Sequence, residues 1–145
     1  MFSVTREKKV LNSLISVCRM ALDVESGSVM TVDKYDHLRV TASFELNKDI
    51  ADITYQKIGE GIAGMAAETS ETIILPKDHG KKGVCNAMKR NDIKSSMIMP
   101  FNKADSREVY GVLNLNIMRK NREFSRKDIS LAKELVNLAS IALFA

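Results

Sequence analysis

Apolar residues recur every three or four positions near both ends of the chain. In residues 2–23 they are Val10, Leu11, Leu14, Val17, Cys18, Ala21 and Leu22. This spacing places them on one side of a helix. Near the other end, Ser125 precedes Arg126 as a candidate N-cap, and a helical pattern runs from there to the C-terminus. The pattern therefore predicts a long helix at each end of the chain.

Two pairs of short apolar and β-branched runs between these helices predict hairpins. The runs GSVMTV, from Gly27, and LRVTASFEL, ending at Leu46, flank residues 33–36, whose two acids favour a turn. Residues 95–102 and 109–118 flank a second polar turn, NKADSRE. Four strands in two hairpins are therefore expected.

The middle of the chain predicts smaller elements. TIIL, at residues 72–75, has the composition of a strand, and residues 53–58 mix apolar with polar side chains, as an edge segment does. Residues 84–91 are compatible with a short helix. The expected order is helix, hairpin, glycine segment with small helices, strand, hairpin and helix, in one domain of residues 1–145.

Gly59, Gly61 and Gly64 match the G-x-G-x-x-G pattern of dinucleotide-binding folds, and Asp78 stands where the ribose-binding acid would be. The segment between Gly64 and the next strand gives only about two helical turns, whereas a crossover between parallel strands needs a dozen or more residues. The preceding segment is also too polar for a strand buried on both faces. We interpret the glycines as a tight turn that lets the next helix approach closely.

Composition narrows the possible environments. The chain has 145 residues, a net charge of +4, two cysteines and no tryptophan. Basic residues are interspersed with acids and lack the aromatic platform of single-strand binders, so no nucleic-acid partner is expected. Cys18 and Cys85 lie far apart without a nearby pair of histidines, which indicates neither a disulfide nor a metal site. With no apolar signal core and no run of about 18 apolar residues, we expect a cytoplasmic protein with no membrane contact.

Four motifs in order resemble a GAF domain, the sensory module of cyclic-nucleotide phosphodiesterases, bacterial signalling kinases and phytochromes. They are IGEGIAGMAAETSETIILP, IKSSMIMPF, EVYGVLNLN and EFSRKDISLAKELVNLASIAL, and together they span nearly the whole chain. The resemblance implies an α+β fold with α/β/α-like layers. A central antiparallel sheet of five or six strands would carry the terminal helices on one face. Short helices and loops would roof a pocket on the other.

Alternation along the GVLNLN strand indicates which side chains face that pocket, because successive side chains on a strand point to opposite faces. If Leu113 and Leu115 pack against the long helices, Asn114 and Asn116 must face the pocket. The family register adds further candidate ligand contacts on the same face and on the segments above it. These are Ser96, Ile98, Ser28 and Met30 on strands, Ile62 and Met65 on the roof, and His79, Cys85 and Met88 on the closing segment. The identity of any ligand or cofactor stays open.

Three alternatives follow from the same family. The first is a dimerisation scaffold whose vestigial pocket is filled by side chains and water. The second is an enzyme similar to free methionine sulfoxide reductase, although Ser96, Asn114 and Asn116 stand where acids would bind the substrate. The third is a redox sensor at Cys85, where nearby lysines would favour the thiolate.

Ligands known for other branches have weaker support. Asn86 follows Cys85 where bilin-binding members carry histidine, and only Phe124 and Asp128 match the cyclic-nucleotide motif. We therefore expect a non-enzymatic domain without catalytic residues, which transmits the occupancy of its pocket through the terminal helices.

The last helix has two apolar stripes, of which only one can cover the sheet. The first consists of Ile129, Ala132, Val136, Ala139 and Leu143, and the second of Leu131, Leu135, Leu138 and Ala142. A second stripe suits a homodimer formed through the terminal helices. Because no glycine or proline stops the helix before Ala145, we expect either a stand-alone dimer or an effector domain in the same chain.

Overall fold

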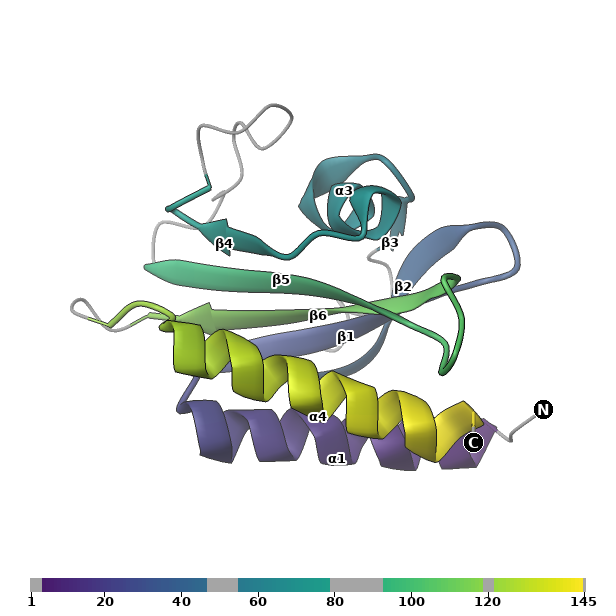
Figure 1. Ribbon diagram of the computed structural model, residues 1–145, viewed down its shortest axis with the longest axis horizontal. Coiled ribbons are helices and arrows are strands. Elements are labelled where there is room, and N and C mark those ends of the chain that lie inside the picture. Colours follow the sequence, from purple (N-terminus) through teal and green to yellow (C-terminus); the bar gives the residue numbers. More distant parts are fainter. Residues whose placement is uncertain (1–3, 47–54, 79–92, 119–121, 145) are drawn as a thin grey trace.

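The computed structural model describes residues 4–46, 55–78, 93–118 and 122–144, and six strands in these ranges form one antiparallel sheet (Figure 1). The strands are β1 (Ser26–Val32), β2 (His37–Phe44), β3 (Tyr55–Lys57), β4 (Ile73–Leu75), β5 (Ser95–Asn102) and β6 (Val109–Ile117). They lie in the order β3-β2-β1-β6-β5-β4. Strands β1 and β6 are therefore neighbours at the centre of the sheet.

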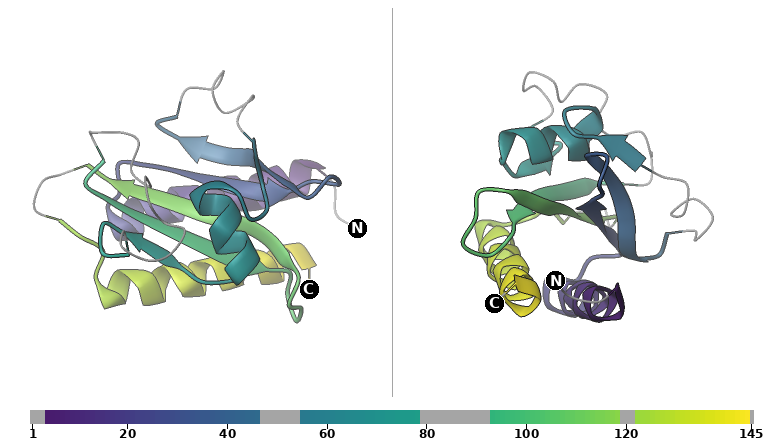
Figure 2. Two further views of the ribbon diagram at one scale, coloured as in Figure 1. Left: turned by 90° about the horizontal axis from the view of Figure 1, so that it is seen from above. Right: turned by 90° about the vertical axis from the view of Figure 1, so that its right-hand side faces the viewer.

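The helices cover opposite faces of this sheet. Helices α1 (Val4–Leu22) and α4 (Arg126–Phe144) lie side by side on one face, and α3 (Gly61–Thr69) lies on the other (Figures 1 and 2). The two long helices run in opposite directions, and the guanidinium of Arg6 donates a hydrogen bond to the carbonyl oxygen of Ala142, 2.6 Å away. The expected α+β fold is confirmed.

Two local signals read from the sequence act as expected. The carboxylate of Asp33 accepts hydrogen bonds from the backbone N–H groups of Tyr35, at 2.8 Å, and His37, at 3.0 Å, and so closes the turn of the first hairpin. At the start of α4, the Ser125 hydroxyl accepts from the backbone N–H of Asp128 at 3.1 Å, and the Asp128 carboxylate accepts from that of Ser125 at 2.8 Å. This reciprocal pair is a capping box.

The glycine segment is a turn followed by α3, as the sequence indicates. Gly59 and Gly61 adopt positive φ angles of 92° and 67°, which glycine reaches without a steric penalty. The N–H of Gly59 donates to the carbonyl oxygen of Gly64 at 2.8 Å. A Cβ on Gly64 would collide with the backbone oxygen of Lys57, so this glycine lets α3 lie directly against the turn.

The dinucleotide-binding arrangement is absent from the described sheet, because all of its strand pairs are antiparallel. Asp78 has a structural position instead of a ribose-binding one. Its carboxylate accepts a hydrogen bond of 2.7 Å from the backbone N–H of Ile74, and its own N–H donates to the Ile74 carbonyl at 2.7 Å. Asp78 therefore closes the turn that follows β4.

A few predicted boundaries differ from the observed ones. The segment expected at 53–58 gives the three-residue edge strand β3, and β2 ends at Phe44, where Glu45 turns the backbone with a φ of 53°. The helix predicted at 84–91 lies outside the described residues. No helix in the described ranges is long and apolar enough to cross a membrane.

Candidate functional site

Between residues 112 and 117, the side chains of β6 alternate between the two faces of the sheet as the sequence predicts. Leu113 and Leu115 are fully buried in the core formed with α1 and α4. Val112 belongs to a second core beneath α3, and Asn114 and Asn116 follow it at spacings of two residues. The two amides therefore share the face that carries α3.

Strand register arranges the candidate residues of this face in three rows across the sheet. Ser26, Asn116 and Ser96 form the outer row, and Ser28, Asn114 and Ile98 form the middle row. The inner row is Met30, Val112 and Pro100. Polar character thus decreases from the outer row to the inner row, where Met30 and Val112 join the apolar core beneath α3.

Hydrogen bonds join the side chains of the outer row. The Ser96 hydroxyl donates to Oδ1 of Asn116 at 2.7 Å, and Nδ2 of Asn116 donates to Oγ of Ser26 at 3.0 Å. Ser26 and Ser96 are only 3% and 5% exposed. Asn116 and Ser96, both predicted ligand contacts, are therefore already engaged with their own neighbours.

The middle row lacks such a network. Oδ1 of Asn114 is shielded from solvent and has no hydrogen-bond partner in the part of the chain that the structure describes. Its neighbour on β5, Ile98, offers none, and no hydrogen bond of the Ser28 hydroxyl is found among the described residues. Buried polar groups are nearly always paired, so Asn114 is the unusual polar group of this face.

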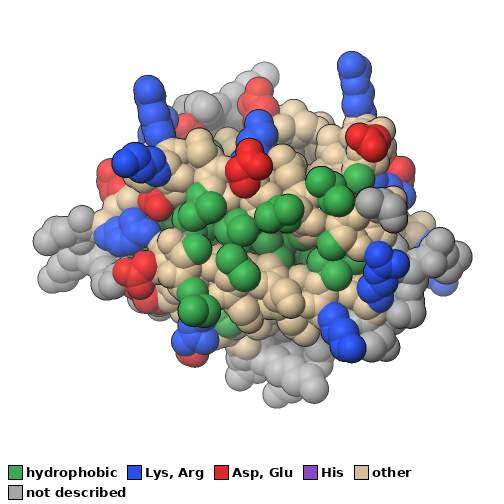
Figure 3. Space-filling view, turned by 60° about the horizontal axis from the view of Figure 1, so that its bottom comes forward, with side chains coloured by type: hydrophobic (Ala, Val, Ile, Leu, Met, Phe, Trp, Pro, Cys, Tyr) green, Lys and Arg blue, Asp and Glu red, His purple; other side chains and the backbone are tan. Residues whose placement is uncertain are grey.

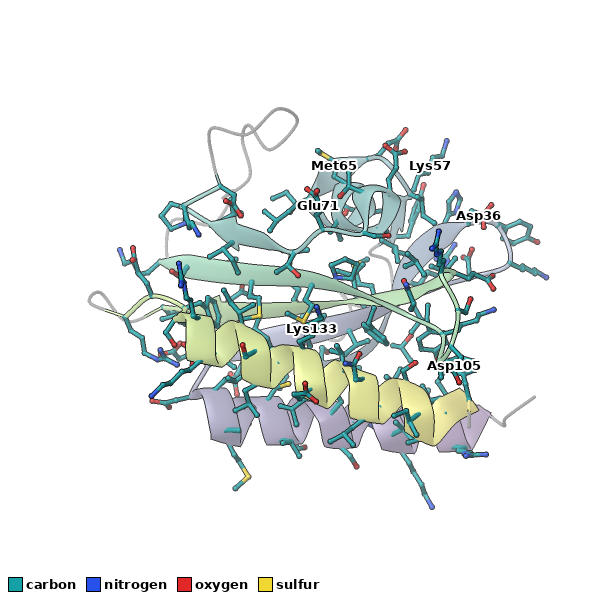
Figure 4. The ribbon with its side chains drawn as sticks, viewed as in Figure 1. Asp36, Lys57, Met65, Glu71, Asp105 and Lys133 are labelled. Carbon is teal, nitrogen blue, oxygen red and sulfur yellow. The ribbon has the colours of Figure 1, made fainter. Side chains whose placement is uncertain are left out.

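The other candidate contacts lie above the sheet. Ile62 and Met65 on α3 are partly buried and pack against the core of this face, and Figure 4 shows Met65 on α3, with Lys133 on the opposite side of the sheet. His79, Cys85 and Met88 lie outside the described residues. Whether any of these positions binds a ligand stays a prediction.

Ser26 also lies on the face that carries α3, although the sequence pattern did not single it out. It stands two positions before Ser28 on β1 and therefore points to the same face. Ser28 was selected by the family register, and alternation from Ser28 along β1 would have found Ser26. Its role as a partner of Asn116 depends on the register between β1 and β6, which the sequence does not reveal.

Two surface hollows lie away from the outer and middle rows. One, of about 740 Å³, runs between α4 and the turn that joins β5 to β6, with Pro100, Lys133 and Ile141 in its lining. The other, of about 790 Å³, lies where α1 begins and α4 ends, beside Glu7 and Tyr110. Among the described residues, none of the predicted ligand contacts lines either hollow.

The described residues carry little of the chemistry that catalysis uses. Cys18 is fully buried between helix and sheet, and burial raises the pKa of its thiol to about 12, so it is not a nucleophile at neutral pH. Within the described ranges, no three His, Cys, Asp or Glu side chains gather in a way that could hold a metal ion.

Phe124 and Asp128, the two matches to the cyclic-nucleotide motif, have structural positions. Phe124 is buried in the core between the sheet and the long helices. Asp128 belongs to the capping box of α4, and its carboxylate also lies 3.4 Å from the guanidinium of Arg122. Neither side chain is on the face of Asn114.

Comparison with known proteins gives one family and a common fold. The model of the GAF domain family matches residues 4–143. No curated protein sequence matches the chain.

Solved structures share the fold at low sequence identity. The GAF domain of an Acinetobacter phosphoenolpyruvate-protein phosphotransferase superposes with a TM-score of 0.76 at 21% identity, over 94% of this chain and 81% of that chain. A GAF domain/HD domain protein from Geobacter sulfurreducens gives 0.78 at 14% identity, over 97% and 93%. A type II free methionine-R-sulfoxide reductase from Thermoplasma acidophilum gives 0.70 at 11% identity, over 95% and 94%.

Proposed function

Because this chain belongs to the GAF domain family, we propose that it is a non-enzymatic regulatory domain that binds a small molecule on the α3 face of its sheet. Ligand binding would move β6, and β6 would in turn shift α1 and α4. One observation carries this proposal: Asn114 on β6 faces the candidate site, while its neighbours Leu113 and Leu115 are fully buried against the long helices.

This arrangement supports a direct mechanical connection. A ligand that moves Asn114 also moves the backbone of β6, and the two adjoining leucines are close-packed. The ligand can shift the helices only by as much as its affinity differs between the two arrangements. The cytoplasmic setting and an effector domain in the same chain stay predictions.

The reductase among the structural relatives supports an enzyme only weakly. At 11% identity it supports the shared fold and no more. In this chain the polar side chains on the α3 face of β5 and β6 are Ser96, Asn114 and Asn116, without an acid. Serine and amide groups do not supply general acid or base catalysis at neutral pH, which favours binding over turnover.

A screen for binding tests the proposal. Cyclic nucleotides, purines, amino acids and 2-oxo acids would be added to the protein, and the thermal midpoint followed, because a ligand of the folded state raises it. Native mass spectrometry of protein purified without denaturation would detect a ligand that is already bound. Hydrogen exchange in α4 should then change with the ligand. A protein that holds no ligand and responds to none would instead be a dimerisation scaffold.

We further propose that a second copy of the chain covers the exposed apolar stripe of α1 and α4. Val17 and Met20 on α1 are 44% and 84% exposed, and Leu131 and Leu138 on α4 are 39% and 62% exposed. Figure 3 shows a hydrophobic band on the face that carries α1 and α4. Exposed apolar patches of this kind mark interaction sites, and symmetric dimers are the commonest assemblies.

The burial of the first apolar stripe of α4 supports this interpretation. Ala132, Val136, Ala139 and Leu143 are buried against the sheet, as the first predicted stripe requires. In the second stripe Leu131, Leu138 and Ala142 are exposed, whereas Leu135 is partly buried and packs against the core. Part of this stripe is therefore left uncovered within the chain. Sedimentation velocity at tens of micromolar would measure whether a dimer forms.

A further inference from the structure

The two asparagines of β6 differ in the hydrogen-bonding groups that they can offer to a ligand. Asn116 uses its oxygen and one N–H group in the bonds to Ser96 and Ser26. Asn114, one row further in, keeps a buried oxygen that no described residue pairs with. The neighbouring Ser28 hydroxyl makes no hydrogen bond within the described part of the chain. The free hydrogen-bonding capacity of this face is therefore concentrated at Asn114 and Ser28.

An amide has a donor and an acceptor on adjacent atoms, and this limits what can pair with it. If the oxygen and nitrogen of the Asn114 amide were exchanged, the unpaired group would be an N–H pair instead of a carbonyl. In either orientation, a partner with an adjacent donor and acceptor satisfies the amide. A carboxamide, a lactam or the edge of a nucleobase has this pattern.

Charge is the second constraint. The described side chains in the three rows are hydroxyls, amides and apolar groups, and none of them carries a charge. The Asn114 row itself continues through Ile98 to Ile73 on β4, which is 6% exposed. A carboxylate or phosphate placed here would lose water without gaining an opposite charge from these rows, which is strongly unfavourable. A neutral molecule avoids that penalty.

We infer that the site takes an uncharged molecule whose adjacent donor and acceptor pair with the amide of Asn114, and that it rejects the corresponding anion. Ile98 and Ile73 contact the apolar body of the molecule, and Ser28 is the second polar contact. This inference rests on the proposed function, since it names the ligand class of the same site. Asn116 instead links β6 to β5 and β1 through its hydrogen bonds to Ser96 and Ser26.

Matched probes test the charge constraint. Nicotinamide and nicotinate have the same ring and differ in a carboxamide against a carboxylate, and inosine differs from inosine 5′-monophosphate only in the phosphate. We expect the neutral probe of at least one pair to raise the thermal midpoint and its anionic partner to leave it unchanged. Asn114→Leu should weaken binding of the neutral probe about tenfold or more, and Ser28→Ala should weaken it less.

Stability without any probe is an independent measurement. Asn114→Leu removes a buried amide oxygen that no described residue pairs with, at similar volume, so its midpoint should equal or exceed that of the wild type. Asn116→Leu is the matched control, because it removes the hydrogen bonds that Asn116 makes to Ser96 and Ser26 and should lower the midpoint. Equal losses in both variants would show that Asn114 is already satisfied within the protein, and would overturn the inference.

The failures of the two proposals are distinguishable. If the anion binds as well as the neutral probe, or if Asn114→Leu binds the neutral probe normally, the ligand class is wrong while small-molecule binding stands. If neither neutral probe binds at millimolar concentration, the ligand class is also wrong. The proposed function fails only if, in addition, natively purified protein carries no ligand and the wider screen finds none.

Discussion

The hydroxyl of Tyr110 on β6 donates a hydrogen bond to the carboxylate of Glu7 on α1, a residue 103 positions earlier in the chain. The ring of Tyr110 also meets Phe144 of α4 edge-on, with 4.9 Å between ring centroids. One side chain of the central strand thus contacts both terminal helices near the end where α1 begins and α4 finishes. Burial and then the nearby Glu7 carboxylate raise the pKa of Tyr110, so its hydroxyl stays protonated.

Tyr110→Phe should lower the free energy of unfolding by about 1.5–3 kcal/mol, the range for a hydrogen bond to a charged group. The ring contacts remain in this variant, so the loss isolates the hydroxyl. Glu7→Gln keeps a hydrogen-bond acceptor and should lose less. Urea unfolding measures both values, and equal stability of Tyr110→Phe and the wild type would contradict the expected strength of the bond.

Gly64→Ala should destabilise the protein more than an alanine in an open helix position, because the added Cβ collides with the backbone oxygen of Lys57. Overpacking of this kind typically lowers stability by about 1–3 kcal/mol. Gly59→Ala is the comparison, since its Cβ would meet the flexible Glu68 side chain, although φ is unfavourable there. Thermal unfolding of the two variants would compare them. A neutral Gly64→Ala would mean that α3 can move away from the turn.

Leu138→Glu should convert a dimer into a folded monomer. The side chain is 62% exposed within one copy, so the charge is tolerated in the monomer but not in a buried apolar interface. The thermal midpoint extrapolated to low concentration should stay close to that of the wild type. Lys133→Glu, on α4 but outside the stripe, is the charge control and should leave the assembly intact. A wild type that sediments as a monomer at high micromolar concentration would exclude this interface.

Asp33 should contribute stability that disappears only in acid. Partial burial raises its pKa, but hydrogen bonds from the His37 N–H, the Arg39 side chain and the Tyr35 N–H outweigh this effect and lower the pKa to about 2. The unfolded value is about 3.9. The contribution is therefore complete above about pH 4 and is lost as the pH falls towards 2.

The Asp33→Asn variant should remove this part of the pH dependence. Its stability, measured by urea unfolding between pH 2 and pH 5, should change less with pH than that of the wild type over the same interval. The difference between the two proteins should shrink as the pH falls. A constant difference across the interval would mean that the lowered pKa of Asp33 does not contribute.

Cys18 should stay unlabelled by an alkylating reagent at pH 8 for as long as the protein is folded. Its side chain is fully buried, and burial raises the thiol pKa to about 12, so both access and thiolate fraction are low. Peptide mapping after limited labelling would show whether Cys85 reacts first, as the redox-sensor hypothesis predicts. The Cys18→Ala variant is the control for assigning the label. Equal and slow labelling of both thiols would remove that hypothesis.

Periodicity in the sequence determined the long helices and, along residues 112–117 of β6, the face that each side chain occupies. Spacings of three to four residues placed α1 and α4, and alternation by itself separated Leu113 and Leu115 from Asn114 and Asn116. These features depend on local backbone geometry alone, in which side-chain direction repeats with a fixed period. Local signals also located the Asp33 turn and the Ser125 cap, since both act within a few residues.

Tertiary structure decided which residues meet, because strand register and helix placement are set by packing across the whole chain. Two amides in one strand looked equivalent in the sequence. Register gave Asn116 a serine on each side and gave Asn114 an isoleucine and a serine that bonds to none of the described residues. The bond between Tyr110 and Glu7 likewise joins positions too far apart for any local pattern to connect. The face of the sheet on which a side chain lies follows from the two-residue period of a strand. Its hydrogen-bond partners follow only from the three-dimensional arrangement of the chain.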